Sequence, residues 1–396
     1  MSNSNFTVEY NKKELPSSLS KIGFLLFGLG LVLVILAFYF DSVRSAFNSV
    51  IFLTFVTSIG LGSLFWITVE YLSGAVWSTP FRRVAEFFGA LLFILPLLAL
   101  PAYFNMHEIY HWTHTAVVEG DEYLKAKSSY LDVSFFAIRN LVFFLIWIIF
   151  FYFITRNSLK QDENGDQSYT KKNLRWSAIF IPFFALTISF FSIDWLMSLE
   201  PHWFSTIFGI YYFAGTVLAA LAAITYTIIK LNERGYFVKG LNQDHYYSFG
   251  ALLFGFINFW AYIAFSQYLL IWYGNLPEET FWFLEKWEGN WIIYSVLLIV
   301  IHFVVPYFAL LSQPSKMNPK RLKFMSLWIL AAHYFDLLWI VMPTYEEGSY
   351  VPGWVELSFP ILAVGLIILI FNWRAKNKNL VPIGDPKLKR GINFRL

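Results

Sequence analysis

The stretch IGFLLFGLGLVLVILAFYF, residues 22–40, decides the class of fold. It contains no charged side chain and is long enough, as a helix, to cross roughly 30 Å of hydrocarbon. Similar apolar stretches recur along the 396-residue chain, which is 57% hydrophobic and only 14% charged, whereas soluble domains are about 25% charged. The sequence therefore predicts an all-α polytopic membrane protein and excludes a soluble globular fold.

Apolar runs bounded by charged and turn residues predict about ten transmembrane helices. Their approximate ranges are 22–40, 49–72, 84–105, 133–155, 174–198, 204–229, 246–273, 289–312, 324–344 and 353–373. With a cytoplasmic N-terminus, 24 of the 29 Lys and Arg residues fall on the cytoplasmic side. The positive-inside rule therefore predicts that both termini are cytoplasmic.

Two short identities indicate an internal duplication. FGALLF occurs at residues 88–93 and again at 249–254, and Asp194 and Asp336 each stand seven residues before a proline. We therefore predict two four-helix bundles, spans 2–5 and 6–9, flanked by spans 1 and 10. The expected division is a cytoplasmic leader at 1–21, peripheral span 1 at 22–46, a first unit at 47–203, a second unit at 204–345, peripheral span 10 at 346–374 and a basic cytoplasmic tail at 375–396.

The chain has no cysteine, which excludes disulfides, thiolate-ligated iron–sulfur clusters and cysteine zinc sites within it. It also lacks both the GxxxxGK[ST] phosphate loop and the GxGxxG dinucleotide unit, so an ATP-driven pump and a nucleotide dehydrogenase are excluded. We expect this chain by itself to bind no metal or redox cofactor and no nucleic acid.

Ionisable side chains inside the spans are few, and such groups usually face the bundle interior. They are Glu70, Asp194, His302, His333 and Asp336. His333 and Asp336 are three residues apart and share a helix face, where a carboxylate beside an imidazole can pass a proton or hydrogen-bond a quinone oxygen. The alternative is a pair that only satisfies itself between packed helices. Haem ligation by His302 and His333 is not expected, because Asp336 competes for one of them.

Residues 107–111, HEIYH, match the HExxH zinc-protease motif, in which two histidines bind zinc and the glutamate activates water. The motif stands at the outer end of a span, and His114 extends it into a helical stripe of histidines within an aromatic belt. No third ligand in a protease-like context is evident. We therefore favour outer-edge proton exchange or interfacial anchoring for His107, Glu108 and His111, with an intramembrane metalloprotease as a rival.

The segment DWLMSLEPHWFSTIFG, residues 194–209, resembles the hallmark of the F subunit (ActF-type) of bacterial alternative complex III, a quinol:cytochrome c oxidoreductase. Residues 265–277, FSQYLLIWYGNLP, and residues 333–345 resemble it too, and the likeness extends over nearly the whole chain. The resemblance implies membership of the polysulfide-reductase NrfD-like membrane family. It also implies a bacterial inner-membrane location and a subunit without redox centres of its own.

The resemblance further implies partners: a sister NrfD-like C subunit, an iron–sulfur subunit, multihaem cytochrome c subunits and a terminal oxidase. Haem c and iron–sulfur clusters then belong to those subunits, and quinone is the one small molecule this chain would bind. We expect proton transfer through Asp194, Glu200, His202, His333, Asp336 and Arg139, with His107, Glu108, His111 and Gln267 at a quinone or outer-edge proton-exchange site.

A secondary transporter is the main alternative, because duplicated units and polar groups at mid-membrane depth suit that class too. Two observations count against it. The two units are predicted to insert in the same orientation, and no pair of Gly- or Pro-broken helices stands at matching depth.

Overall fold

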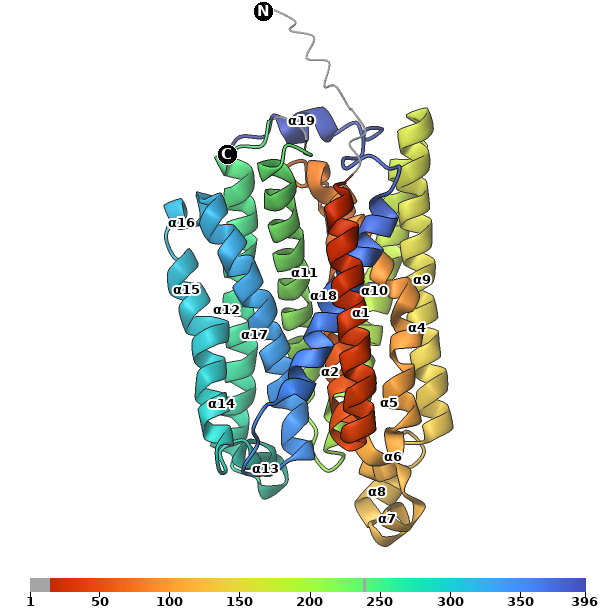
Figure 1. Cartoon of the computed structure of the whole chain (residues 1–396), viewed down its shortest axis with the longest axis vertical. Helices are drawn as coiled ribbons and strands as arrows, with labels where there is room; N and C mark the ends of the chain where they lie inside the picture. Colours follow the sequence, from red (N-terminus) through yellow and green to blue (C-terminus); the bar gives the residue numbers. More distant parts are fainter. Residues whose placement is uncertain (1–14, 238–239) are drawn as a thin grey trace, which may run out of the picture.

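Ten helical spans of the computed structural model, which describes residues 15–237 and 240–396, are long and apolar enough to cross a membrane. They run side by side as one bundle (Figure 1). No strand occurs in the described ranges. The predicted all-α polytopic membrane fold is therefore confirmed.

Eight of the ten spans are each built on one continuous helix. They are α1 (Ser17–Phe40), α2 (Ser42–Ser73), α9 (Val133–Asn164), α10 (Ser168–Trp195), α11 (Phe208–Glu233), α12 (Gln243–Gly274), α17 (Pro319–Tyr345) and α18 (Trp354–Ala375). The predicted span boundaries agree to within a few residues, except where polar ends such as that of α9 extend the helix beyond its apolar stretch.

The remaining two spans are interrupted. The third, Thr79–Phe104, consists of η1 (Thr79–Phe81), α3 (Arg82–Gly89), η2 (Ala90–Ile94), α4 (Leu95–Leu98) and α5 (Leu100–Phe104). It contains Pro96 and Pro101, and proline removes a backbone donor from the helix ladder.

The eighth span, Trp291–Leu310, contains α14 (Trp291–Leu298), the π-helical turn η5 (Ile299–Val304) and α15 (Val305–Leu310). Pro306 has no N–H to bond the carbonyl of His302, four residues earlier, and the ladder widens at that place. The two interrupted spans do not occupy corresponding positions in the two units.

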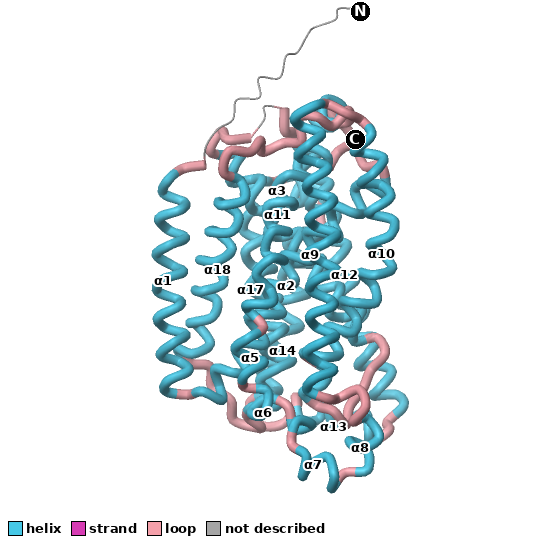
Figure 2. The backbone as a smooth tube through the Cα atoms, turned by 90° about the vertical axis from the view of Figure 1, so that its right-hand side faces the viewer, coloured by secondary structure: helices cyan, strands magenta, loops and turns pink. Residues whose placement is uncertain are grey.

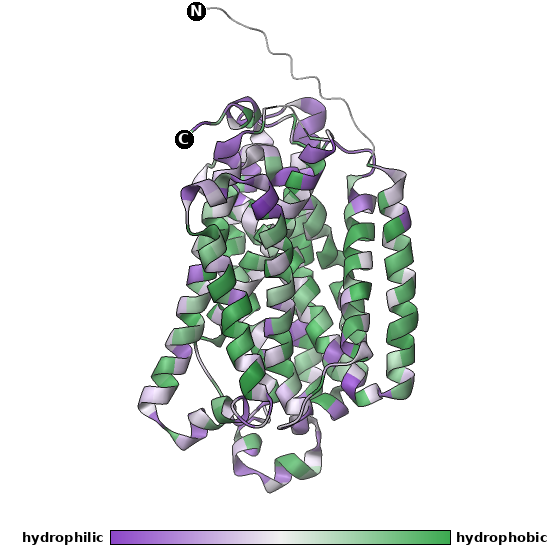
Figure 3. Cartoon of the chain, turned by 60° about the vertical axis from the view of Figure 1, so that its left-hand side comes forward, coloured by the Kyte–Doolittle hydropathy of each residue, from purple (hydrophilic) through white to green (hydrophobic). Residues whose placement is uncertain are grey.

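Short helices connect the spans at the two ends of the bundle. At the α13 end lie α6 (Met106–Ile109), η3 (His111–Thr113), α7 (Thr115–Gly120), α8 (Glu122–Lys127), η4 (Met197–Leu199) and α13 (Pro277–Glu285); at the α19 end lie α16 (Gln313–Met317) and α19 (Leu388–Ile392). The first turn of α1 is also at the α19 end (Figure 1). Green hydrophobic residues predominate along the middle of the helices, and purple hydrophilic residues gather toward the two ends of the bundle (Figure 3).

The spans predicted to form two four-helix units contact one another mainly along α2 and α11, the most deeply buried spans. Small residues allow the close approach, as is common between helices in membranes. A Cβ on Gly62 of α2 would lie only 2.6 Å from the carbonyl oxygen of Thr216 on α11. Helices α1 and α18 form a separate pair at one edge of the bundle, seen in Figure 2.

Buried ion pairs close the α19 end. Arg82 is paired with Glu70 at 2.9 Å and with Asp385 at 2.7 Å, and Arg83 is paired with Asp162 at 2.6 Å. Asp385 belongs to the basic tail that follows α18. The tail is therefore folded onto the bundle, with Leu380, Val381, Leu388 and Ile392 buried.

Candidate functional site

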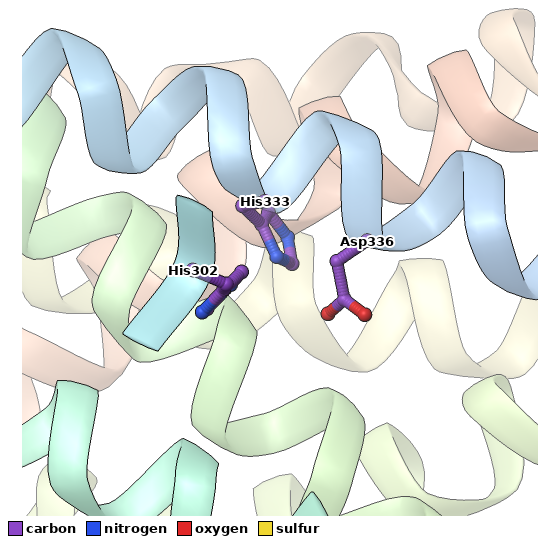
Figure 4. A group of neighbouring side chains, drawn as sticks. All are labelled: His302, His333 and Asp336. Atoms are coloured by element: carbon purple, nitrogen blue, oxygen red, sulfur yellow. The ribbon is translucent and has the colours of Figure 1, made fainter. Parts of the chain in front are cut away.

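Three ionisable side chains meet in the interior of the second unit. The face of α17 presents His333 and Asp336, and the π turn of the eighth span presents His302 toward them (Figure 4). Among the described residues, they are the one group of His, Asp or Glu side chains with three ligand atoms all within 4.8 Å of one another. The predicted shared face of His333 and Asp336 is confirmed, and His302 joins it from another span.

Asp336 is buried among neutral donors. The Tyr211 hydroxyl of α11 donates a short hydrogen bond to its Oδ1, and Trp260 Nε1 of α12 donates to its Oδ2 at 3.1 Å. No Lys or Arg nitrogen of the described chain lies within 4.0 Å of this carboxyl group. Asp336 therefore has no permanent countercharge, an arrangement that suits a group that takes up and releases a proton.

The two histidines keep ring nitrogens without a protein partner. His333 Nε2 lies 3.0 Å from the Ser58 hydroxyl of α2, whereas His333 Nδ1 and both ring nitrogens of His302 have no hydrogen-bond partner. Each histidine is 1% exposed. The Trp260 ring stacks on His302 with ring centroids 3.7 Å apart. Buried nitrogens of this kind are available to bind a ligand, a water molecule or a cation.

A cavity of about 520 Å³ lies beside this cluster, and Tyr211 and Trp260 belong to both. Its wall is mainly aromatic and aliphatic, with Asn258, Gln267 and Ser295 as further polar groups. Gln267 is 4% exposed and its Nε2 has no hydrogen-bond partner. Three other wall residues, Tyr262, Phe265 and Ile299, are 66%, 60% and 53% exposed. Because these three lie within spans, the cavity opens on the lipid-facing side of the bundle.

The corresponding carboxylate of the first unit has different surroundings. Arg139 of α9 binds Asp194 through two nitrogens, at 2.9 and 3.2 Å, and Tyr130 and Asn140 donate to it at 2.9 and 3.2 Å. Asp194 is completely buried, and Arg139 is its ion-pair partner. Asp194 therefore accepts four hydrogen bonds, two of them from the cationic Arg139, so it has a permanent countercharge that Asp336 lacks.

Glu200 and His202 do not join Asp194. Glu200 follows η4 at the α13 end and hydrogen-bonds the side chain of Thr344, and burial raises its pKa above the ordinary value. His202 Nε2 bonds Asp121 Oδ2 at 2.6 Å, and its side chain is 48% exposed. The structure therefore separates the predicted group of Asp194, Glu200 and His202 into three environments.

The predicted helical stripe of histidines is wrong. Helix α6 ends at Ile109 and Tyr110 is extended, so His107 and His111 do not lie one turn apart on a helix. His107 Nδ1 instead bonds the Thr113 hydroxyl at 3.0 Å, and His114 Nε2 bonds the His107 carbonyl at 2.8 Å. Glu108 is exposed in the same short helix. A zinc-protease site needs the helical spacing and does not fit here.

The sequence patterns do not predict the two neutral side chains that donate hydrogen bonds to Asp336. Tyr211 and Trp260 are 5% and 3% exposed and donate hydrogen bonds to the buried carboxyl group of Asp336. Lys286 lies between the predicted spans 246–273 and 289–312, and the structure buries its side chain to 1% exposure. A helical projection of α11 and α12 could have flagged the first two, whereas only tertiary packing buries Lys286.

Comparison with known proteins assigns no family: no protein-family model matches the sequence, and no curated protein matches it. The multi-pass helical membrane fold and the buried cluster of His302, His333 and Asp336 beside a lipid-facing cavity are what the structure establishes.

Proposed function

We propose that this chain is the integral-membrane subunit of a quinol:electron-acceptor oxidoreductase of the alternative complex III type. It binds quinol in the second unit and takes up the protons that quinol oxidation releases. The observation that carries the proposal is the lipid-facing cavity backed by a buried carboxylate and two imidazoles with free nitrogens.

The cavity matches the chemistry of a quinone. Ligand pockets of about 300–1,000 Å³ with mostly apolar walls and a few placed polar groups bind small molecules, and this one has about 520 Å³. An isoprenoid tail would extend through the lipid-facing opening. The free Nε2 of Gln267 would donate to a ring oxygen.

Quinol oxidation releases two protons and two electrons. The chain has no cysteine to hold an iron–sulfur cluster. Both electrons would go to haem or iron–sulfur groups held by partner subunits. Asp336 would accept one proton through the Tyr211 hydroxyl that it already bonds, and His302 would accept the other at a free ring nitrogen. The first unit is not expected to work in this way, because Asp194 is already paired with the Arg139 guanidinium.

The proposed setting is the inner membrane of a bacterium. The α19 end contains most of the basic residues and would face the cytoplasm, and the α13 end would face the periplasm. The partners are those implied by the resemblance of residues 194–209: a sister C subunit, an iron–sulfur subunit, multihaem cytochromes and a terminal oxidase. The cavity of the second unit opens to lipid, which supports this assignment better than a secondary transporter.

The test uses Asp336→Asn in the complex isolated from native membranes. The substitution keeps the size of the side chain and removes proton uptake, so we expect quinol turnover to fall at least ten-fold. Asp121→Asn, at a partly exposed carboxylate of the α13 end, is the matched control and should keep wild-type turnover. Ala264→Phe fills the cavity and should reduce labelling of the chain by a photoreactive quinone.

Two results would contradict the proposal. One is wild-type turnover of Asp336→Asn in a fully assembled complex. The other is isolation of the chain, under mild detergent, without haem- or iron–sulfur-containing partners.

A further inference from the structure

A second cluster of ionisable groups lies at the α13 end, where the two units meet. Lys286 follows α13, and its ammonium is 3.6 Å from the centroid of the Trp282 ring and 5.4 Å from that of Trp339. Its Nζ is 3.4 Å from the Trp282 carbonyl oxygen. The position is outside the membrane-spanning segments, yet Lys286 is only 1% exposed.

Lys286 has no ion-pair partner. No carboxylate oxygen in the described part of the chain lies within 4.0 Å of its Nζ, whereas the buried Arg82, Arg83 and Arg139 each have one. A buried charge without a partner is costly. Such a lysine is readily deprotonated, and burial does lower the pKa of Lys286 well below its ordinary value.

Carboxylates from both units surround this lysine at longer range. Glu200 of the first unit and Glu285 of the second act on its charge, and Glu347, Glu288 and His111 act on those two carboxylates. Burial raises the pKa of both Glu200 and Glu285. For each of these three groups, the free-energy difference between its neutral and its charged form at neutral pH is therefore smaller than in water.

The cluster adjoins the proposed quinol cavity. Trp282 and Trp339, the two rings that contact Lys286, also line the cavity, and Trp339 follows Asp336 by three residues, about one helical turn along α17. Ser295, a further wall residue, donates to the Lys286 carbonyl and accepts from Trp339 Nε1, each at 2.8 Å. Hydrogen bonds thus hold the lysine against the end of the cavity that lies toward α13.

We infer that Lys286, with Glu200 and Glu285, is the proton-exchange site between the cavity and the solvent at the α13 end. The Lys286 amine accepts a proton from the cavity and becomes an ammonium. The ammonium then passes that proton to the carboxylate of Glu200 or Glu285, and the carboxyl group releases the proton to water. One proton moves and no electron is involved. The inference rests on the proposed function, because the proton comes from quinol bound in the second unit.

The test compares two substitutions of Lys286 in the complex in native membrane vesicles. Lys286→Met removes the charge and the proton site. Lys286→Arg keeps a cation against Trp282 and Trp339, but a guanidinium does not release its proton. We expect both variants to slow proton release at the α13 side at least ten-fold after a pulse of quinol, measured with a pH indicator on that side. Lys125→Met, at an exposed lysine of α8, should release protons at the wild-type rate.

Restoration of proton release by Lys286→Arg would overturn the inference, because it would show that only the cation and its packing are needed. If the lysine variants do not assemble, the double variant Glu200→Gln/Glu285→Gln tests the same site, and wild-type release in it overturns the inference. Asp336→Asn separates the two proposals. If it stops turnover while the Lys286 variants release protons normally, the inference fails and the proposed function stands.

Discussion

Asp194 and Asp336 each stand seven residues before a proline, but their partners differ in charge. Asp194 is bound by Arg139, Tyr130 and Asn140, whereas Asp336 is bound only by the neutral Tyr211 and Trp260. The Arg139 guanidinium, 2.9 Å from Asp194, gives that carboxyl group a permanent countercharge, and Asp336 has none. A single arginine therefore distinguishes the buried ion pair at Asp194 from the carboxyl group at Asp336, which has only neutral partners.

The Asp194 pair should behave as a coupled unit in stability. Arg139→Gln leaves a buried charge without its partner, so we expect a loss of about 3–5 kcal/mol in the free energy of unfolding. Arg139→Gln/Asp194→Asn removes both charges and should recover much of that loss. Denaturation in mixed micelles measures each variant, and additive losses in the double variant would disprove the coupling.

Glu200 should make stability depend on pH. Because burial raises its pKa in the folded protein, the folded state binds more protons than the unfolded state above the ordinary carboxyl pKa of 4.5. Its contribution to stability is present below that pH and is lost as pH rises through the folded pKa. Thermal unfolding from pH 4 upward should therefore show a shallower decline for Glu200→Gln than for the unsubstituted protein, and equal slopes would refute this.

Helices α11 and α17 pack closely enough that a glycine helps to position the buried cluster of His302, His333 and Asp336. A Cβ on Gly215 of α11 would lie 2.7 Å from Cε1 of His333, which is too close for the rigid imidazole to stay in place. The π turn has a similar role in the eighth span, because it carries His302. The apolar helix α11 and the π turn η5 thus set the positions of the His333 and His302 side chains.

Gly215→Ala should therefore displace His333 and lower quinol turnover several-fold while the chain still assembles. Gly255→Ala on α12 is the control, since nothing lies within 4 Å of its added Cβ. Turnover of the two variants in isolated complex provides the comparison. Equal activity would show that the position of the imidazole is not important.

At the scale of the whole molecule, the tail after α18 ties the two units together at the α19 end. Asp385 binds Arg82 of the first unit at 2.7 Å, and the Gly391 carbonyl bonds His245 of the second at 2.8 Å. Glu70 and Glu86 also contact Arg82, so the arginine is the centre of a buried network. The tail is a structural strap across both units as well as a source of positive charge.

Breaking the strap should expose it to proteolysis. Asp385→Asn removes the charged partner of Arg82, and we expect trypsin to cleave at Lys387 or Lys389 several-fold faster in vesicles that expose the α19 end. Glu163→Gln, at an exposed carboxylate of α9, is the control. Unchanged cleavage of Asp385→Asn would show that the apolar contacts of the tail are sufficient to hold it.

The sequence by itself determined the class of fold, the ten spans and the shared helix face of His333 and Asp336, because apolar length and helical spacing are local properties. Tertiary structure decided the rest. Only packing of spans distant in sequence brings His302, Tyr211 and Trp260 to Asp336, assigns Arg139 to Asp194 and buries Lys286. The same local chemistry, a carboxylate seven residues before a proline, therefore acquires two different electrostatic environments from its neighbours in space.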